Sequence, residues 1–167
     1  MSLPREHNAK NIEGRLNELA ASVKTRARAN LTDANHILET ITKRFFNALF
    51  GWNLVNLNGL QANYPAADLG DHGLRIAIQV TNEGGSDKIS HTAGKAVDHE
   101  LGKAFDTLII FFLLPKKHGF PKGFTQPANG PKIETRDIAD LLEQMLDMDD
   151  LEALAKALNE RESLKLE

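Results

Sequence analysis

The 167-residue chain contains no cysteine, which excludes a disulfide framework, a thiolate metal site and a thiol nucleophile. It also lacks a long hydrophobic run, because residues 108–114 are far fewer than the roughly 20 apolar residues that a membrane-spanning helix needs. At the start, Arg5, Glu6 and Lys10 stand where a signal peptide would have its apolar region. The sequence therefore predicts a soluble, cytoplasmic protein of about one domain, with no membrane partner.

The formal net charge of −3 is unevenly distributed along the chain. Residues 1–50 hold 8 Lys/Arg against 5 Asp/Glu, residues 51–132 hold 8 against 7, and residues 133–167 hold 4 against 11. The acidity therefore belongs to the last segment, and the preceding 132 residues are mildly basic. A basic surface is typical of proteins that bind nucleic acid, so this part of the chain permits such a partner.

Hydrophobic periodicity predicts an α/β domain with a mixed four-stranded sheet. Helices are expected at 10–29, 32–50 and 86–104, strands at 53–57, 64–69, 74–81 and 106–114, and two further helices at about 135–146 and 149–161. The first three strands should form an antiparallel meander, and the helix between the last two strands implies a parallel pair. We divide the chain into a core at 1–114, a Pro/Gly-rich loop at 115–132 and an acidic helical extension at 133–167.

Strand alternation gives the third predicted strand two different faces. Ile76, Ile78 and Val80 point to one side, and Arg75, Ala77, Gln79 and Thr81 to the other. A neighbouring antiparallel strand would bring the Asp68 carboxylate alongside the Gln79 amide, with the Val80 carbonyl next in sequence. Oxygen ligands of this kind suit Mg²⁺, which commonly uses only one or two carboxylates.

The PD-(D/E)XK nuclease pattern has an Asp near the end of one strand and, on the next strand, an acidic residue or Gln, one spacer and Lys. Asp68 and Gln79 match the first two positions, so the chain resembles this superfamily. The Gln variant is similar to its Mrr-type restriction endonuclease branch. More narrowly, residues 35–114 resemble the bacterial SMEK domain through Phe45-Phe46-Asn47, Leu49-Phe50-Gly51-Trp52-Asn53-Leu54, Asn56-Leu57-Asn58, Asn63-Tyr64-Pro65, Asp68-Leu69-Gly70-Asp71 and residues 75–81. The resemblance implies a restriction-endonuclease-like three-layer core with a C-terminal helical extension. SMEK domains are often the N-terminal module of larger proteins, some of them linked to phage defence.

The same resemblance implies a catalytic role for Asp68, Gln79, Thr81 and Lys88. Asp68 would bind Mg²⁺ or Mn²⁺, with Gln79 as a second ligand or an orienting group, and Glu39 on the second helix would add the missing carboxylate. The departure from the pattern is Thr81, because the nuclease motif has a Lys there and a hydroxyl supplies no positive charge. Lys88, at the start of the next helix, would act as a displaced substitute.

Each of these residues also has an ordinary structural interpretation. Asp68 could accept backbone hydrogen bonds at a hairpin. Gln79 and Thr81 could form the polar face of a half-covered strand, and Lys88 and Glu39 could be solvated surface residues.

Lys88, His91 and Lys95 recur at helical spacing and would form a cationic stripe suited to a phosphate backbone, with a solvated helix face as the alternative. Trp52 and the nearby phenylalanines are expected in the core rather than in a base-stacking platform.

Three functions follow from these residues. The first is a nucleic-acid-binding domain that cleaves phosphodiester bonds with Mg²⁺. The second is an inactive module of the same fold that binds nucleic acid or protein. The third is an oligomerisation module, a homodimer, in which the helices containing Leu141 and Leu154 pair between chains.

Overall fold

The computed structural model describes residues 31–61, 64–81, 86–113 and 119–137, together with the single residues Lys10, Gly14, Ala21 and Asp140. The four single residues are helical. Most of the expected helix at 10–29, most of the one at 135–146 and all of the one at 149–161 lie outside the described residues.

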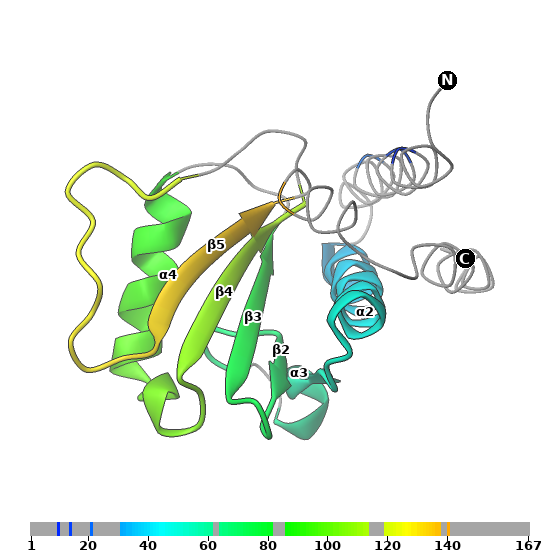
Figure 1. Ribbon diagram of the computed structural model, residues 1–167, viewed down its shortest axis with the longest axis horizontal. Helices are drawn as coiled ribbons and strands as arrows, with labels where there is room; N and C mark the ends of the chain where they lie inside the picture. The colour runs from blue at the N-terminus through cyan, green and yellow to red at the C-terminus, as the bar shows by residue number, and fades with distance from the viewer. Residues whose placement is uncertain are drawn as a thin grey trace.

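One mixed sheet of five strands forms the centre of the domain (Figure 1). Its spatial order equals its sequence order: β1 (Val55–Asn56), β2 (Leu69–Asp71), β3 (Ile76–Thr81), β4 (Thr107–Phe112) and β5 (Lys132–Asp137). The pairs β1–β2 and β2–β3 are antiparallel, whereas β3–β4 and β4–β5 are parallel. The predicted antiparallel meander and parallel pair are thus both present.

The expected strand count of four is wrong, because β5 adds a fifth strand from a segment that we assigned to a loop and a helix. The helix expected from about residue 135 does not begin there, since the chain stays extended to Asp137. β5 is a polar edge strand whose buried apolar side chain is Ile133. Its polar alternation gives little hydrophobic signal, and the backbone of β4 supplies the pairing that holds it in the sheet.

β2 begins later than predicted, at Leu69 rather than at residue 64. Pro65 cannot donate a backbone hydrogen bond to a sheet, and Ala66 has a φ of 65°. That left-handed conformation costs a non-glycine residue roughly 1 kcal/mol and interrupts an extended strand. The chain therefore turns through residues 64–67 and becomes a strand only after Asp68.

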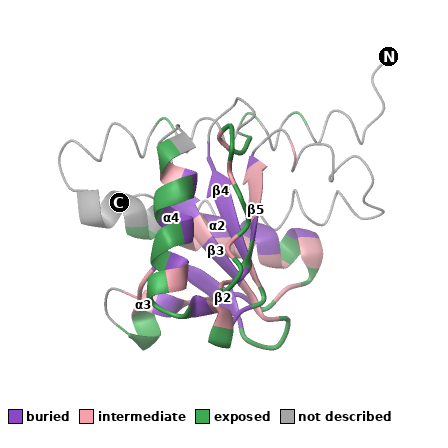
Figure 2. Ribbon diagram, turned by 90° about the vertical axis from the view of Figure 1, so that its left-hand side faces the viewer, coloured by how far each residue is buried: buried purple, intermediate pink, exposed green. Residues whose placement is uncertain are grey.

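Helices cover both faces of the sheet (Figure 2). α4 (Ser86–Asp98) packs on one face with the short 3-10 turn Leu101–Lys103 that follows it, and α2 (Leu31–Phe50) packs on the other. The α4 side is apolar: Ile89, Ala93, Ala96, Leu101 and Phe105 meet Ala77, Leu108, Ile110, Phe112 and Ile133. β4 is accordingly buried on both faces, as its continuous apolar run predicted.

α2 ends where the sequence indicates. Gly51 has a φ of +69°, and its N–H donates to the Asn47 carbonyl at 3.0 Å, a left-handed helix end that favours glycine. The Phe46 ring then packs edge-on against Phe111 of β4, with ring centroids 5.1 Å apart. Trp52 stacks on Phe50 at 4.7 Å, so these aromatic side chains pack against one another beside the sheet.

Within the part of the chain that the structure describes, no helix has the length and apolar character to span a membrane.

Candidate functional site

Asp68 lies at the point where β1, β2 and β3 meet. Its backbone N–H donates to the Ile78 carbonyl and its carbonyl accepts from the Leu57 N–H, both at 2.9 Å. The carboxylate Oδ2 accepts a further hydrogen bond from the Val80 N–H at 2.9 Å. The β2–β3 register pairs Leu69 with Ile78, so one step further along Asp68 lies opposite Gln79. Three hydrogen bonds therefore fix this residue in place.

Glu39 reaches Asp68 from α2, and their carboxyl groups form a side-chain hydrogen bond. α2 is attached to the chain just before β1 by Asn47, whose Oδ1 accepts from the Leu54 N–H at 2.8 Å and whose Nδ2 donates to the Leu54 carbonyl at 3.3 Å. Two carboxyl groups separated by 29 positions in sequence thus share one partly buried position.

Burial perturbs both carboxyl groups, and each also affects the other. Burial first, and then the charge of Asp68 and the hydrogen bond to it, raise the pKa of Glu39 from 4.5 to about 8. Burial also raises the pKa of Asp68, although the Val80 N–H, Glu39 and Lys88 oppose the shift. Two adjacent carboxylates resist ionising together, so in the absence of a cation the pair retains a proton near neutral pH.

Lys88 supplies positive charge near the pair. It lies in the first turn of α4, is partly buried, and its ammonium group lowers the pKa of Asp68 through its charge. A cation near a helix N-terminus is unfavourable with respect to the helix dipole, and the negative charge of Asp68 compensates for it here.

Gln79 and Thr81 face the α4 side of the sheet, alternating with Ile78 and Val80. The Gln79 amide Nε2 donates to the Val80 carbonyl at 3.4 Å, so this amide contacts the backbone one residue after its own position. Thr81 is 6% exposed at the end of β3. The position that has Lys in the nuclease pattern is therefore a buried hydroxyl.

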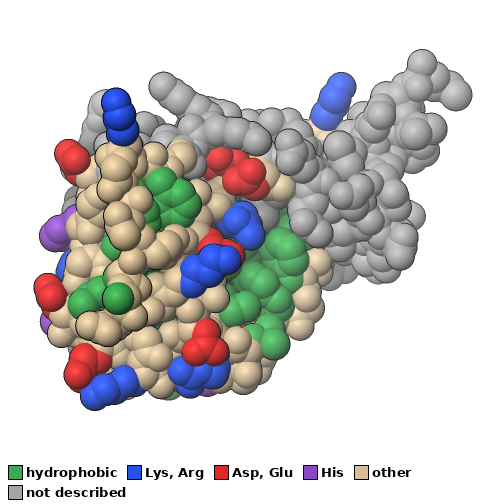
Figure 3. Space-filling view, turned by 60° about the vertical axis from the view of Figure 1, so that its left-hand side comes forward, with side chains coloured by type: hydrophobic (Ala, Val, Ile, Leu, Met, Phe, Trp, Pro, Cys, Tyr) green, Lys and Arg blue, Asp and Glu red, His purple; other side chains and the backbone are tan. Residues whose placement is uncertain are grey.

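His91 and Lys95 lie on α4 beyond Lys88, and both are exposed to solvent. In Figure 2 the outer face of α4 is exposed while the opposite face is buried against the sheet. On the molecular face shown in Figure 3, basic and acidic side chains are interspersed. The structure thus brings Glu39, Asp68 and Lys88 together and leaves His91 and Lys95 on the outside of the helix.

Two asparagines complete the cluster, and in the sequence they stand out only as part of the Asn56-Leu57-Asn58 motif that resembles the SMEK domain. The side chains of Asn56 and Asn58 hydrogen-bond the Glu39 carboxyl group, and Asn58 also bonds that of Asp68. Both hydrogen bonds lower the pKa of Glu39. The Asn-Leu-Asn spacing is the only sequence signal for them, and it is equally typical of an ordinary turn.

The donor set determines which ligand the cluster suits. Among the described residues, no group of three or more His, Asp or Glu side chains could hold a metal ion. The site instead offers two hydrogen-bonded carboxyl groups with a lysine near them. A hard divalent cation that retains most of its water fits such a set, because Mg²⁺ is often bound through one or two carboxylates.

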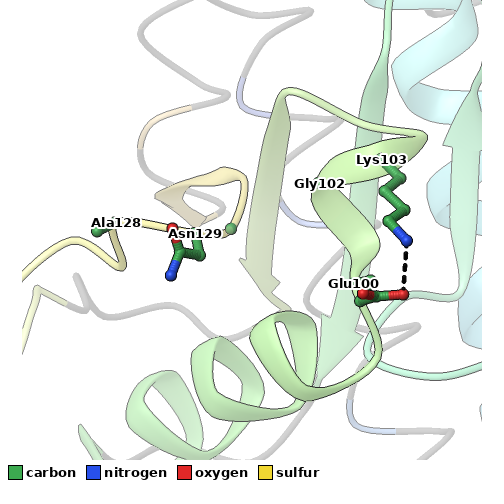
Figure 4. Close-up of a pocket in the computed structure, with 6 residues that line it drawn as sticks. Glu100, Gly102, Lys103, Ala128 and Asn129 are labelled. Carbon is green, nitrogen blue, oxygen red and sulfur yellow. Dashed lines mark hydrogen bonds and ion pairs between the residues drawn. The ribbon is translucent and has the colours of Figure 1, made fainter.

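Two surface cavities lie elsewhere on the domain. One of about 240 Å³ lies between the 3-10 turn and the loop before β5, and is lined by Glu100, Gly102, Lys103 and residues 128–130 (Figure 4). The two charged residues of this cavity form a salt bridge with each other, with Lys103 Nζ 2.8 Å from Glu100 Oε2. The other, of about 170 Å³, is lined by Phe46, Phe50, Trp52 and residues of β3, β4 and β5 on the α2 side. Neither includes the carboxylate pair.

The fold and the site define a mixed α/β domain with a pair of coupled carboxylates between a helix and the sheet. The family model of the SMEK domain matches residues 11–151, and the chain belongs to this family. Searches of curated proteins and of solved structures found no match.

Proposed function

We propose that this SMEK domain is a nuclease-like domain that binds nucleic acid and cleaves phosphodiester bonds with Mg²⁺ or Mn²⁺. One observation carries the proposal: Glu39 and Asp68 come from different elements and form a hydrogen-bonded carboxyl pair beside Lys88. Pairing two partly buried carboxyl groups costs stability. A site that accepts this cost is a candidate functional site.

In this proposal Glu39 and Asp68 would hold the cation, which would supply charge neutralisation at the phosphate and an activated water. Asp68 is suited to the role because the Val80 N–H fixes one carboxylate oxygen, so its position does not depend on the cation. Lys88 would contact a phosphate oxygen, in place of the lysine that Thr81 replaces. Gln79 would orient the backbone at Val80 and would not be a primary ligand of the cation, since its amide donates to the Val80 carbonyl.

The test is cleavage of single- and double-stranded DNA and RNA with Mg²⁺ or Mn²⁺, for the wild type and for Asp68→Asn. The substitution keeps the shape of the side chain and removes its charge, so we expect a loss of activity of roughly 100-fold or more. Asp98→Asn is the matched control, because Asp98 is an exposed carboxylate of α4, and it should cleave like the wild type. Equal cleavage by all three proteins, or none by the wild type with any substrate, would refute the catalytic proposal.

A second candidate is a module of this kind that binds nucleic acid without cleaving it. The buried hydroxyl of Thr81 favours it, since the expected positive charge is missing from β3. The supporting result would be affinity that falls steeply as salt is raised, without product formation. Lys95→Ala and Lys88→Ala should then each reduce the salt dependence by about one phosphate contact.

A further inference from the structure

The two asparagines of the cluster have the oxygen ends of their amides occupied by the backbone. Asn56 precedes α3 (Leu57–Leu60) as its N-cap, and its Oδ1 accepts from the Asn58 N–H at 2.9 Å and from the Gly59 N–H at 3.3 Å. Asn58 Oδ1 accepts from the Tyr64 N–H at 2.9 Å. Each amide is therefore held in one orientation.

With the oxygens held by backbone donors, the amide NH₂ groups are the ends left to face the carboxyl groups. Asn56 bonds Glu39, and Asn58 bonds both Glu39 and Asp68. An NH₂ group donates only, so it stabilises the ionised form of a carboxyl group relative to the protonated form. The asparagines are thus suited to orient the carboxyl groups and not to bind a cation themselves.

Capping alone does not account for this choice of side chain. Ser and Asp cap a helix about as well as Asn does, but neither ionised Asp nor Ser presents an NH₂ donor beyond the cap. Asn is the side chain that accepts from the α3 backbone with one end while donating to a carboxylate with the other.

We propose that Asn56 and Asn58 are positioning residues, which hold the Glu39 and Asp68 carboxyl groups in the orientation that binds a divalent cation. This inference rests on the proposed function, because it assumes that the carboxyl pair receives a cation. Partners that orient ligating carboxylates typically change metal affinity by 10–100-fold when they are removed.

The experiment measures Mn²⁺ affinity by electron paramagnetic resonance on the whole chain, with no nucleic acid and no activity required. Asn56→Ser keeps a capping oxygen and loses the NH₂ donor, so we expect Mn²⁺ binding to weaken by about 10-fold while the midpoint of thermal unfolding stays close to that of the wild type. Asn58→Ser should also bind Mn²⁺ more weakly. Asn129→Ser, in the exposed loop before β5, is the matched control and should bind like the wild type.

A role limited to capping predicts the opposite pattern. Asn56→Ser would then retain wild-type affinity, while Asn56→Ala would lose stability and show no separate effect on Mn²⁺. Wild-type affinity in both Ser variants would overturn the inference and leave the proposed function intact. If the wild type binds no Mn²⁺, both fail together.

Discussion

The surroundings of the carboxyl groups in this domain shift their pKa values in opposite directions. Asp71, 7% exposed, accepts hydrogen bonds from the Leu74 N–H at 3.0 Å and the Asn53 N–H at 2.9 Å. These backbone donors lower the pKa of Asp71. For Glu39 and Asp68 burial outweighs the donors and raises the pKa. Asp71 thus serves the β2–β3 turn, whereas the pair is unfavourable unless something binds it.

These shifts predict how stability depends on pH without a divalent cation. The native state holds more protons on Glu39 and Asp68 than the unfolded chain does, so stability should fall as pH rises from about 4.5 towards about 8. The contribution of Asp71 to stability depends on pH in the opposite direction. Its lowered pKa stabilises the fold, and this stabilisation is lost as pH falls below the unfolded pKa of about 3.8. We therefore expect maximum stability between the two unfolded pKa values, from about 3.8 to about 4.5.

Glu39→Gln tests this expectation, because it removes one of the two coupled charges. Urea unfolding at pH 8 should show a gain of roughly 1–3 kcal/mol relative to the wild type, with little difference at pH 5. Asp98→Asn should reproduce the wild-type profile, since Asp98 is exposed on α4. A wild-type stability that rises steadily from pH 5 to 8 would contradict the assignment.

At the scale of elements, β2 packs against the core at Gly70, where there is no room for a larger side chain. Gly70 faces the α4 side of the sheet, where a Cβ atom would lie 2.7 Å from Cζ of Phe105 and 3.1 Å from a methyl group of Leu57. Both neighbours are fully buried. The close approach holds β2, and with it Asp68, against the core.

Gly70→Ala should therefore destabilise the domain by roughly 1–3 kcal/mol, because an added methyl group overpacks a buried site. Gly94→Ala provides the matched comparison. Gly94 lies on the exposed face of α4, and a Cβ atom added there would have nothing within 4 Å, so alanine should stabilise by about 0.5–1 kcal/mol. Denaturant unfolding of both variants measures the two effects. Equal stability of the two variants would show that β2 can move away from Phe105.

Sequence patterns predicted the strongly apolar elements and missed α3 and β5. α2 and β4 carry strong apolar periodicity or a continuous apolar run, and both lie where we expected them. α3 is a single turn capped by Asn56, and β5 carries mostly polar residues, so their formation depends on neighbours that local patterns do not contain. The later start of β2 has a local cause in Pro65 and Ala66, but the left-handed φ of Ala66 is unusual for alanine and was not predictable.

At the scale of the whole molecule, the two edge strands of the sheet differ in length. β1 has two residues, whereas β5 has six and lies at the other end of the strand order. The Lys132 N–H donates towards β4, to the Asp106 carbonyl. Because backbone groups alternate in direction along a strand, the N–H and C=O of Ile133 point away from β4, at the edge of the sheet. Gln126 covers them, donating to the Ile133 carbonyl at 2.8 Å and accepting from its N–H at 2.9 Å.

Gln126→Ala should uncover this edge, since an unpaired strand edge is a template for pairing with another chain. We expect a loss of roughly 1–2 kcal/mol in stability and a mass in solution that increases with protein concentration relative to the wild type. Gln61→Ala is the control, because Gln61 is exposed beyond α3. Light scattering that shows the same mass for Gln126→Ala and the wild type at all concentrations would show that the edge is protected by other means.

The sequence alone determined the α/β class, the buried central strand and the starts of the two main helices, because apolar periodicity is a local property of the chain; α4 ends at Asp98 rather than at residue 104. It also nominated Glu39, Asp68 and Lys88, with a surface position as the alternative for Glu39 and Lys88 and a hairpin hydrogen-bond acceptor as the alternative for Asp68. Only the tertiary structure decided that these three lie together and that Asn56 and Asn58 join them. The physical reason is that burial and electrostatic coupling depend on distances between elements, which β-sheet register and helix packing set.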